Sequence, residues 1–258
     1  MKLLEVENLS VRYGTTTILK NVDFSVDENN WLMVVGPNGA GKTTLINAVS
    51  QYIGYTGRIR YLGRDIKTYK PRELAQNLGV LSQSYSVNYP FTVGEVVRLG
   101  RYAYTPGIFS RKSGEDEEKV RSALELTGLT ELADRSVLTL SGGELQRTFL
   151  AQVLAQDPKI LMLDEPTNHL DLVYQKQILE LIRRWLCGEK RAVISVVHDL
   201  SLAKAYGTHS LLLDRGSAVA QGEIDEVFSP VHLDKAYSVD VYAWMDDMLS
   251  QWRGREEL

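Results

Sequence analysis

Short apolar runs and alternating segments predict two kinds of β-structure in this chain. Residues 3–7 and 18–26 alternate apolar and polar positions, which is typical of half-buried antiparallel strands. Continuous apolar runs, which indicate strands covered on both faces of a parallel sheet, occur at residues 31–35, 78–82, 160–163 and 192–197. The pattern therefore predicts an α/β core with antiparallel strands beside it.

The remaining segments complete this outline. Pro71 stands where a short helix begins, a position at which proline is tolerated, and residues 91–156 change to helices joined by polar turns. Residues 172–186 predict another helix, and residues 223–258 are helical and amphipathic. Further strands are predicted at residues 57–63, 211–213 and 218–220. A helical insert thus interrupts the α/β core.

Composition narrows the class of protein. The chain has 258 residues, 44% hydrophobic and 24% charged, so it is long enough for a packed α/β domain. Its net charge of -4 disfavours nucleic acid as the main partner. The single cysteine, Cys187, excludes an intrachain disulfide and a cysteine-based zinc cluster, and it suits a reducing cytosol. Because no apolar run approaches 18 residues, we expect that the chain does not itself span a membrane.

A glycine-rich segment follows the first continuous apolar run and precedes a predicted helix. Its pattern, G-x-x-x-x-G-K-T, comprises Gly36, Pro37, Asn38, Gly39, Ala40, Gly41, Lys42 and Thr43, followed by Thr44. The glycines let backbone N–H groups converge on one anion at the positive end of the helix. Lys42 would charge-pair with the outer phosphates, and the Thr43 hydroxyl is suited to bind Mg²⁺. An ordinary glycine-rich turn does not explain a Lys-Thr pair at this spacing, so the segment predicts phosphate binding.

The other three continuous apolar runs also end at residues suited to phosphate chemistry, namely Gln83, Asp164 with Glu165, and His198. Ligands of open parallel sheets bind at the carboxyl ends of the strands, so we expect these residues to converge. Asp164 would hold Mg²⁺ through water, and Glu165 would accept a proton from the attacking water. His198 would hydrogen-bond the γ-phosphate. Each also has a simpler explanation. Gln83 could be an ordinary polar loop residue, Asp164 and Glu165 an acidic turn, and His198 a residue that precedes a helix N-cap.

A second glycine pair lies at the start of a helix. Ser141 and Glu144 form an S-x-x-E capping box around Gly142 and Gly143. Capping explains the serine and the glutamate but not the glycines, each of which costs a helix interior up to about 1 kcal/mol relative to alanine. Glycines leave N–H groups uncovered at the positive end of the helix, which predicts a second anion site.

These motifs, in this order and with these separations, resemble the ATP-binding subunit of an ABC transporter. The phosphate loop, residues 140–147, residues 160–165 and His198 match that family's Walker A, signature, Walker B and switch-histidine motifs. The resemblance implies an α/β P-loop NTPase (RecA-like) core with an antiparallel β subdomain and an inserted helical subdomain. It also implies ATP and Mg²⁺ as the bound nucleotide and metal.

The resemblance divides the chain as follows. The ABC ATPase domain would span residues 1–228, and a helical tail outside the resemblance would follow at residues 229–258. Within the domain, the nucleotide core would comprise residues 1–88 and 157–228, with residues 89–156 as the helical insert.

The resemblance also implies more specific roles for site residues. Gln83 matches the Q-loop glutamine, which acts at the metal and in hydrolysis, and Asp171 matches the D-loop aspartate. Tyr13 matches the aromatic residue that stacks on adenine, although an aromatic residue at a strand end is otherwise often core. Nucleotide contacts from the signature segment would come from Ser141, Gly142, Gly143 and Glu144.

The resemblance also implies partners. Two copies would form a head-to-tail dimer, with the signature segment of each facing the γ-phosphate bound by the other. A membrane permease would dock on the insert and on the loop after Gln83, placing the subunit at the cytoplasmic face of the membrane. A substrate-binding protein would take part indirectly, and nucleic acid would not.

Two segments suggest the transported substrate. Residues 91–101 and 167–172 look like those of importers for iron–siderophore, heme or cobalamin, although relatives often have a proline and a histidine after the position of Arg101. The alternative is a soluble ABC-type ATPase of iron–sulfur assembly or DNA repair. Repair members usually carry a long coiled-coil insertion, which this chain lacks. A GTPase or small-molecule kinase does not explain the signature segment.

Overall fold

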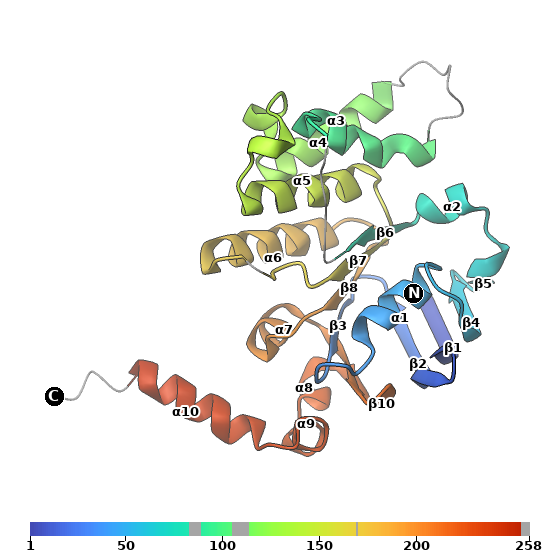
Figure 1. Ribbon diagram of the computed structural model, residues 1–258, viewed down its shortest axis with the longest axis vertical. Helices are drawn as coiled ribbons and strands as arrows, with labels where there is room; N and C mark the ends of the chain where they lie inside the picture. The colour runs from blue at the N-terminus through green and yellow to red at the C-terminus, as the bar shows by residue number, and fades with distance from the viewer. Residues whose placement is uncertain (83–88, 105–113, 169, 254–258) are drawn as a thin grey trace.

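The structure is a computed structural model that describes residues 1–82, 89–104, 114–168 and 170–253. Two β-sheets form its middle, and a group of helices rises from one side of the larger sheet (Figure 1). Gln83 lies outside the described residues, and so do the roles predicted for it.

A six-stranded sheet carries the predicted parallel core. Its order is β10-β9-β3-β8-β7-β6. The strands are β3 (Trp31–Val35), β6 (Leu78–Leu81), β7 (Ile160–Asp164), β8 (Ala192–Val196), β9 (His209–Asp214) and β10 (Ser217–Glu223). β9, β3, β8, β7 and β6 pair in parallel, and β10 closes the edge as an antiparallel hairpin with β9. The four continuous apolar runs are therefore neighbours, and their carboxyl ends meet at one edge as predicted.

The second sheet is antiparallel, with the order β2-β1-β4-β5. Its strands are β1 (Lys2–Tyr13), β2 (Thr16–Asp27), β4 (Thr56–Tyr61) and β5 (Arg64–Asp65). The alternating segments are thus confirmed as antiparallel strands. The strand predicted over residues 57–63 ends early, because Leu62 and Gly63 have φ values of 50° and 76° and form a left-handed turn.

Strand β3 is covered on both faces, which explains its continuous apolar sequence. Trp31, Met33 and Val35 point into a core shared with the helical insert, whereas Leu32 and Val34 point into a core shared with β1, β2 and α1 (Lys42–Val49). Successive side chains of a strand alternate between faces, so a strand covered on both sides must be apolar throughout. The strand that leads into the phosphate loop is fully buried.

Helices account for most of the remaining described chain. The α-helices are α2 (Pro71–Ala75), α3 (Val93–Leu99), α4 (Gly114–Thr127), α5 (Gly142–Ala155), α6 (Leu172–Leu186), α7 (Leu200–Tyr206), α8 (Ile224–Val227), α9 (Pro230–Tyr237) and α10 (Val241–Arg253). Short 3-10 helices are η1 (Ile66–Thr68), η2 (Gly100–Tyr104), η3 (Thr130–Leu132) and η4 (Val137–Thr139). Helix α6 matches the predicted range 172–186. Across the described ranges, every helix is too short or too polar to cross a bilayer.

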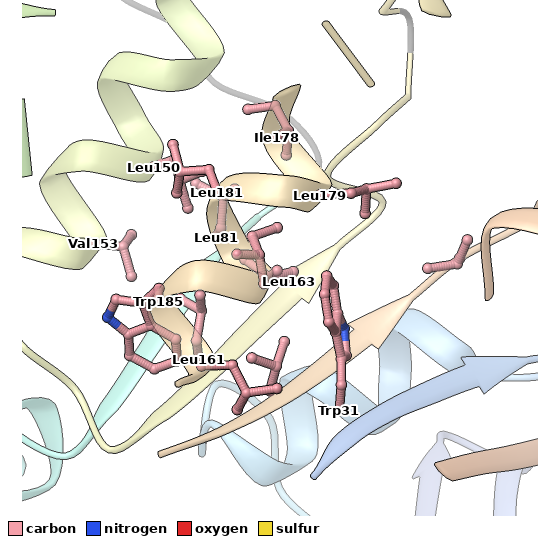
Figure 2. Packing of buried hydrophobic residues seen from close by; sticks show 14 of the residues in the cluster. Trp31, Leu81, Leu150, Val153, Leu161, Leu163, Ile178, Leu179, Leu181 and Trp185 are labelled. Atoms are coloured by element: carbon pink, nitrogen blue, oxygen red, sulfur yellow. The ribbon is translucent and has the colours of Figure 1, made fainter. Parts of the chain in front are cut away.

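The insert is joined to the sheet by apolar packing. Figure 2 shows Leu150 and Val153 of α5 beside Leu181 and Trp185 of α6, with Leu161 of β7 beneath them. All five side chains are buried, and burial of such side chains contributes about 1.5 to 3 kcal/mol each. Helix α6 therefore lies between the insert and the sheet, and it holds the start of α5 near the edge where the strands end (Figure 1).

Candidate functional site

The phosphate loop joins the buried strand β3 to helix α1. Gly36, Gly39 and Gly41 have φ values of 143°, 79° and 97°, so the loop turns through conformations that other residues rarely adopt. Gly41 is the N-cap of α1 and has no side chain to bond the first N–H groups of the helix. These N–H groups therefore remain available to an anion, as the sequence predicted.

Lys42 lies buried within its own loop. Its Nζ donates to the carbonyl oxygens of Gly36 at 2.7 Å and Pro37 at 3.0 Å. Burial lowers the pKa of Lys42, while the carboxylates of Glu165 and Asp164 act in the opposite direction. The ammonium group is thus held by neutral carbonyls beside two carboxylates, at a place where a phosphate would supply a stronger partner.

Thr43 and Asp164 form the second part of the site. The Thr43 hydroxyl donates to Asp164 Oδ1 at 3.2 Å, joining the start of α1 to the end of β7. Burial raises the pKa of Asp164, and the Thr43 hydrogen bond opposes that change. Within the described ranges no three His, Cys, Asp or Glu side chains form a metal cluster. One carboxylate with a hydroxyl fits Mg²⁺, which is usually held by few protein oxygens and by substrate phosphates.

Glu165 points away from its neighbour Asp164. Its φ of 54° is left-handed, a conformation that costs a non-glycine residue about 1 to 3 kcal/mol and occurs often at functional sites. The turn brings one carboxylate oxygen into hydrogen bonding with His198 Nε2, and Oε2 accepts from Asn168 Nδ2 at 2.8 Å. Asn168, three residues after Glu165, was not predicted to have this role. The carboxylate is therefore held between two strand ends.

These groups surround one cavity of about 460 Å³. Its walls comprise loop residues 38–44, Glu165, His198 and Ile18. The predicted convergence of three strand ends is thus confirmed, and the fourth, at Gln83, lies outside the described residues. Ile18 was missed because its pattern is that of an ordinary strand residue. Tyr13, at the end of β1 and 52% exposed, is not among the described lining residues, so its stacking on adenine stays a prediction.

The signature segment lies apart from this cavity. Ser141 is the N-cap of α5, where Glu144 N donates to Ser141 Oγ at 3.3 Å and Ser141 N donates to Glu144 Oε2 at 2.7 Å. These hydrogen bonds from Ser141 hold the pKa of Glu144 below its ordinary value. The capping box is confirmed. Ser141 and Gly142 are exposed, and residues 141–144 do not line the described cavity of their own chain.

The two signature glycines differ in their surroundings. A Cβ on Gly142 would meet nothing within 4 Å, whereas a Cβ on Gly143 would lie 3.1 Å from the ring of Tyr174. Tyr174 is in the first turn of α6, where its N–H donates to Asp171 Oδ1 at 3.0 Å. Asp171 therefore caps α6. Gly143 has an intrachain role that the sequence did not reveal, because the absence of a side chain makes room for the Tyr174 ring.

A side-chain hydrogen bond also ties the signature helix to the end of β7. The Gln146 side chain donates to the carbonyl oxygen of Pro166, which directly follows Glu165. The Arg147 guanidinium lies 5.7 Å from the centre of the Tyr174 ring. The signature segment and the Asp164–Glu165 turn therefore form one connected unit, although they come from different parts of the chain.

Comparison with known proteins agrees with this geometry. A family model described as ABC transporter matches residues 19–168. The chain is 25% identical to an ATP-binding cassette of an ABC transporter, MJ1267, solved in its ADP conformation, with a TM-score of 0.81 over 92% of this chain and 98% of that one.

Three curated proteins are similar over most of this chain. The first is the uncharacterized ABC transporter ATP-binding protein YvrA of Bacillus subtilis (strain 168), 39% identical over 241 residues, which are 93% of this chain and 54% of that protein. The second is the ferric enterobactin transport ATP-binding protein FepC of Escherichia coli (strain K12), 37% identical over 237 residues, 92% of this chain and 87% of FepC. The third is the hemin import ATP-binding protein HmuV of Jannaschia sp. (strain CCS1), 40% identical over 243 residues, 91% and 87% of the two chains.

A parallel sheet with a glycine-rich loop before a helix, and with Thr43 and Asp164 at its edge, defines a P-loop nucleotide-binding protein. The helical insert and the family match then identify the family among P-loop proteins. The chain belongs to the ABC transporter family, as one of its ATP-binding subunits.

The different surroundings of the two signature glycines generate a prediction. Gly142→Ala should raise the free energy of unfolding by up to about 1 kcal/mol, because alanine favours the helix and its Cβ meets open space. Gly143→Ala should lower it by about 1 kcal/mol, because the Tyr174 ring must move. Urea unfolding of the monomer measures both changes.

The same Gly143→Ala change in a Tyr174→Ala background is the control. With the ring removed, the added methyl group should become stabilising. Equal effects of alanine at the two glycines would show that the ring contact does not matter.

Proposed function

We propose that this subunit binds and hydrolyses ATP to power a membrane importer, working as a head-to-tail dimer. The convergence of Lys42, Thr43, Glu165 and His198 on one cavity, with Asp164 bonded to Thr43 beside it, carries the proposal. Separate strands and a helix supply these residues. If each residue were present only for its own structural reason, their meeting at one cavity would have no explanation.

Each residue has a part in this mechanism. Lys42 exchanges its two carbonyl partners for phosphate oxygens, which compensate its charge better. Thr43 and Asp164 supply oxygen atoms for Mg²⁺, which when bound would neutralise charge on the phosphates. Glu165 accepts the proton of the attacking water. His198, already bonded to that carboxylate, orients the water toward the γ-phosphate.

The exposed signature segment supports the dimer. Ser141 and Gly142 face solvent, and the open space around Gly142 leaves the N-terminal N–H groups of α5 accessible. Because residues 141–144 are away from the cavity of their own chain, we propose that they complete the cavity of a second copy. Asp171, the α6 N-cap in the same connected unit, would lie at this interface.

A groove between the insert and the core supports a permease as partner. It encloses about 390 Å³ among α2, β6, η2 and α5, and its wall includes Ser82, which directly precedes Gln83. Leu99 and Tyr102 on its rim are 53% and 71% exposed. We propose that a helix from the cytoplasmic side of a permease docks here, because an apolar rim suits an amphipathic helix.

The names of the relatives suggest the substrate. FepC is named for ferric enterobactin transport and HmuV for hemin import. We therefore propose an iron chelate or heme as the imported substrate, delivered by a binding protein; cobalamin is supported by the sequence resemblance alone. The subunit would work at the cytoplasmic face of the membrane.

The proposed role of Glu165 is tested by Glu165→Gln. The amide cannot accept a proton, so ATP turnover should fall at least about 100-fold while the Kd for ATP changes less than about twofold. Steady-state hydrolysis, nucleotide binding and size-exclusion chromatography with ATP measure the outcome, and an ATP-bound dimer should accumulate. Glu189→Gln, on an exposed turn, is the control and should turn over normally. Near-normal hydrolysis by the Glu165 variant would remove this residue as the base.

The head-to-tail arrangement is tested by Ser141→Arg. The bulky side chain should block ATP-dependent dimerisation, whereas the monomer should still bind ATP, because the segment lies outside its own cavity. Loss of the N-cap should also lower the free energy of unfolding by about 1 kcal/mol. Light scattering and nucleotide titration separate the effects. If the monomer lost ATP binding while remaining folded, the signature segment would act within its own chain.

The docking groove is tested by Leu99→Glu in the chain co-expressed with a membrane permease that the unmodified chain copurifies with. A charge on the apolar rim should weaken assembly at least about tenfold, because a carboxylate would be buried without a partner. Affinity copurification from detergent extracts measures assembly. Leu62→Glu, with a comparable exposure of 49% on the turn between β4 and β5 and not lining the groove, should assemble normally. Equal recovery of the permease with both variants would rule out this groove.

A further inference from the structure

The hairpin of β9 and β10 lies where the six-stranded sheet meets the antiparallel sheet, because β10 contacts β2 (Figure 1). Its two-residue turn consists of Arg215 and Gly216, whose φ values of 44° and 79° are both left-handed. The N–H of Lys20 in β2 donates to the Gly216 carbonyl oxygen at 2.8 Å. A backbone hydrogen bond therefore joins this turn to a strand of the other sheet.

Gly216 lies against Ile18 of β2 and leaves no space for a side chain. A Cβ on Gly216 would lie 2.0 Å from the carbonyl oxygen of Ile18 and 2.9 Å from its carbonyl carbon. Both are backbone atoms, so they could give way only if this part of β2 moved. Ile18 itself lines the cavity of about 460 Å³ beside the phosphate loop. The close approach of the turn therefore fixes the position of a residue in the cavity wall.

The same stretch of β2 also packs against the phosphate loop. A Cβ on Gly41, the N-cap of α1, would lie 2.6 Å from Leu19 Cδ2 and 3.3 Å from the Ile18 carbonyl oxygen. At the start of the loop, a Cβ on Gly36 would lie 2.0 Å from the carbonyl oxygen of Leu213 in β9. The hairpin thus contacts the start of the loop through β9 and Ile18 through its turn, and it holds these two parts of the site relative to each other.

We propose that Gly216 is a positioning residue, which seats Ile18 in the cavity wall, so that the affinity for the nucleotide depends on the turn between β9 and β10. This inference rests on the proposed function in one respect, the binding of a nucleotide in that cavity. Gly216 is not among the described lining residues, so it acts through Ile18 and not by contact with the nucleotide. A wall that is already held in its bound position loses less conformational entropy when the nucleotide binds.

The test compares Gly216→Ala with Gly63→Ala in the full chain. Both glycines lie in turns between strands with left-handed φ values, 79° and 76°, so alanine strains the backbone similarly at each. A Cβ on Gly63, however, would meet nothing within 4 Å. Only Gly216→Ala should raise the Kd for ADP, by about threefold to tenfold, because Ile18 must move. Its kcat at saturating ATP should stay within about twofold, because Glu165 and His198 follow other strands. Calorimetric titration with ADP and Mg²⁺ measures the Kd.

A double-mutant cycle separates an effect through Ile18 from a general loss of packing. Ile18→Ala removes the side chain from the cavity wall. In this background Gly216→Ala should change the Kd for ADP less than about twofold, because the side chain that it displaces is absent. Full additivity of the two changes in binding free energy would overturn the proposal. An unchanged Kd in Gly216→Ala alone would overturn it as well, and so would equal changes in the two glycine variants.

Hydrogen exchange of the unmodified chain, followed by NMR, gives a readout that needs no variant. If the bound nucleotide and the turn stabilise each other, saturating ADP should slow exchange of the Lys20 amide at least about threefold. The Leu62 amide, which donates to the Leu3 carbonyl oxygen at 2.9 Å on the turn between β4 and β5, should keep its rate. If the chain bound ADP with Lys20 exchange unchanged, only the role of Gly216 would be refuted. If it bound no ADP, the proposed function itself would fail.

Discussion

The parallel pairing of β3 between β8 and β9 is the constraint on which the site depends. Val34 pairs with Val196 and Val35 with Leu212, so β3 and β8 end within one residue of each other and β9 runs two residues further, to Asp214. The N–H of Glu165 donates to the carbonyl of Val196 at 3.1 Å, which extends this alignment past the end of β7. A slip of one residue would turn every side chain of β3 to the opposite face, so the buried cores on both sides hold the register.

The same burial sets the electrostatics of the site. Desolvation disfavours the charged form of both Lys42 and Asp164, which lowers the pKa of the lysine and raises that of the aspartate. Two loop carbonyls bind the Lys42 ammonium group, and the Thr43 hydroxyl binds Asp164. Charged phosphates and a metal would compensate these charges more fully than neutral partners do. The electrostatics of the site therefore favour nucleotide binding.

Much of the fold could be predicted because its signals are local. Apolar runs identified the parallel strands, and amphipathic periodicity identified α6 over its observed range. The strand over residues 57–63 was predicted too long, because Leu62 is apolar and its left-handed φ leaves no mark in the pattern. Ile18 and Tyr174 were missed for a different reason. Each has its role through contact with a segment far away in the sequence.

The sequence by itself determined the chemistry at the strand ends: a phosphate loop with Lys42 and Thr43, followed in order by an acidic pair and a histidine. Such groups are recognised by residue type and spacing, which are properties of the chain alone. Only the tertiary structure decided which of them touch. It brought Glu165 to His198 and gave Gly143 a neighbour in Tyr174. These pairings depend on how buried faces pack, which no local pattern contains.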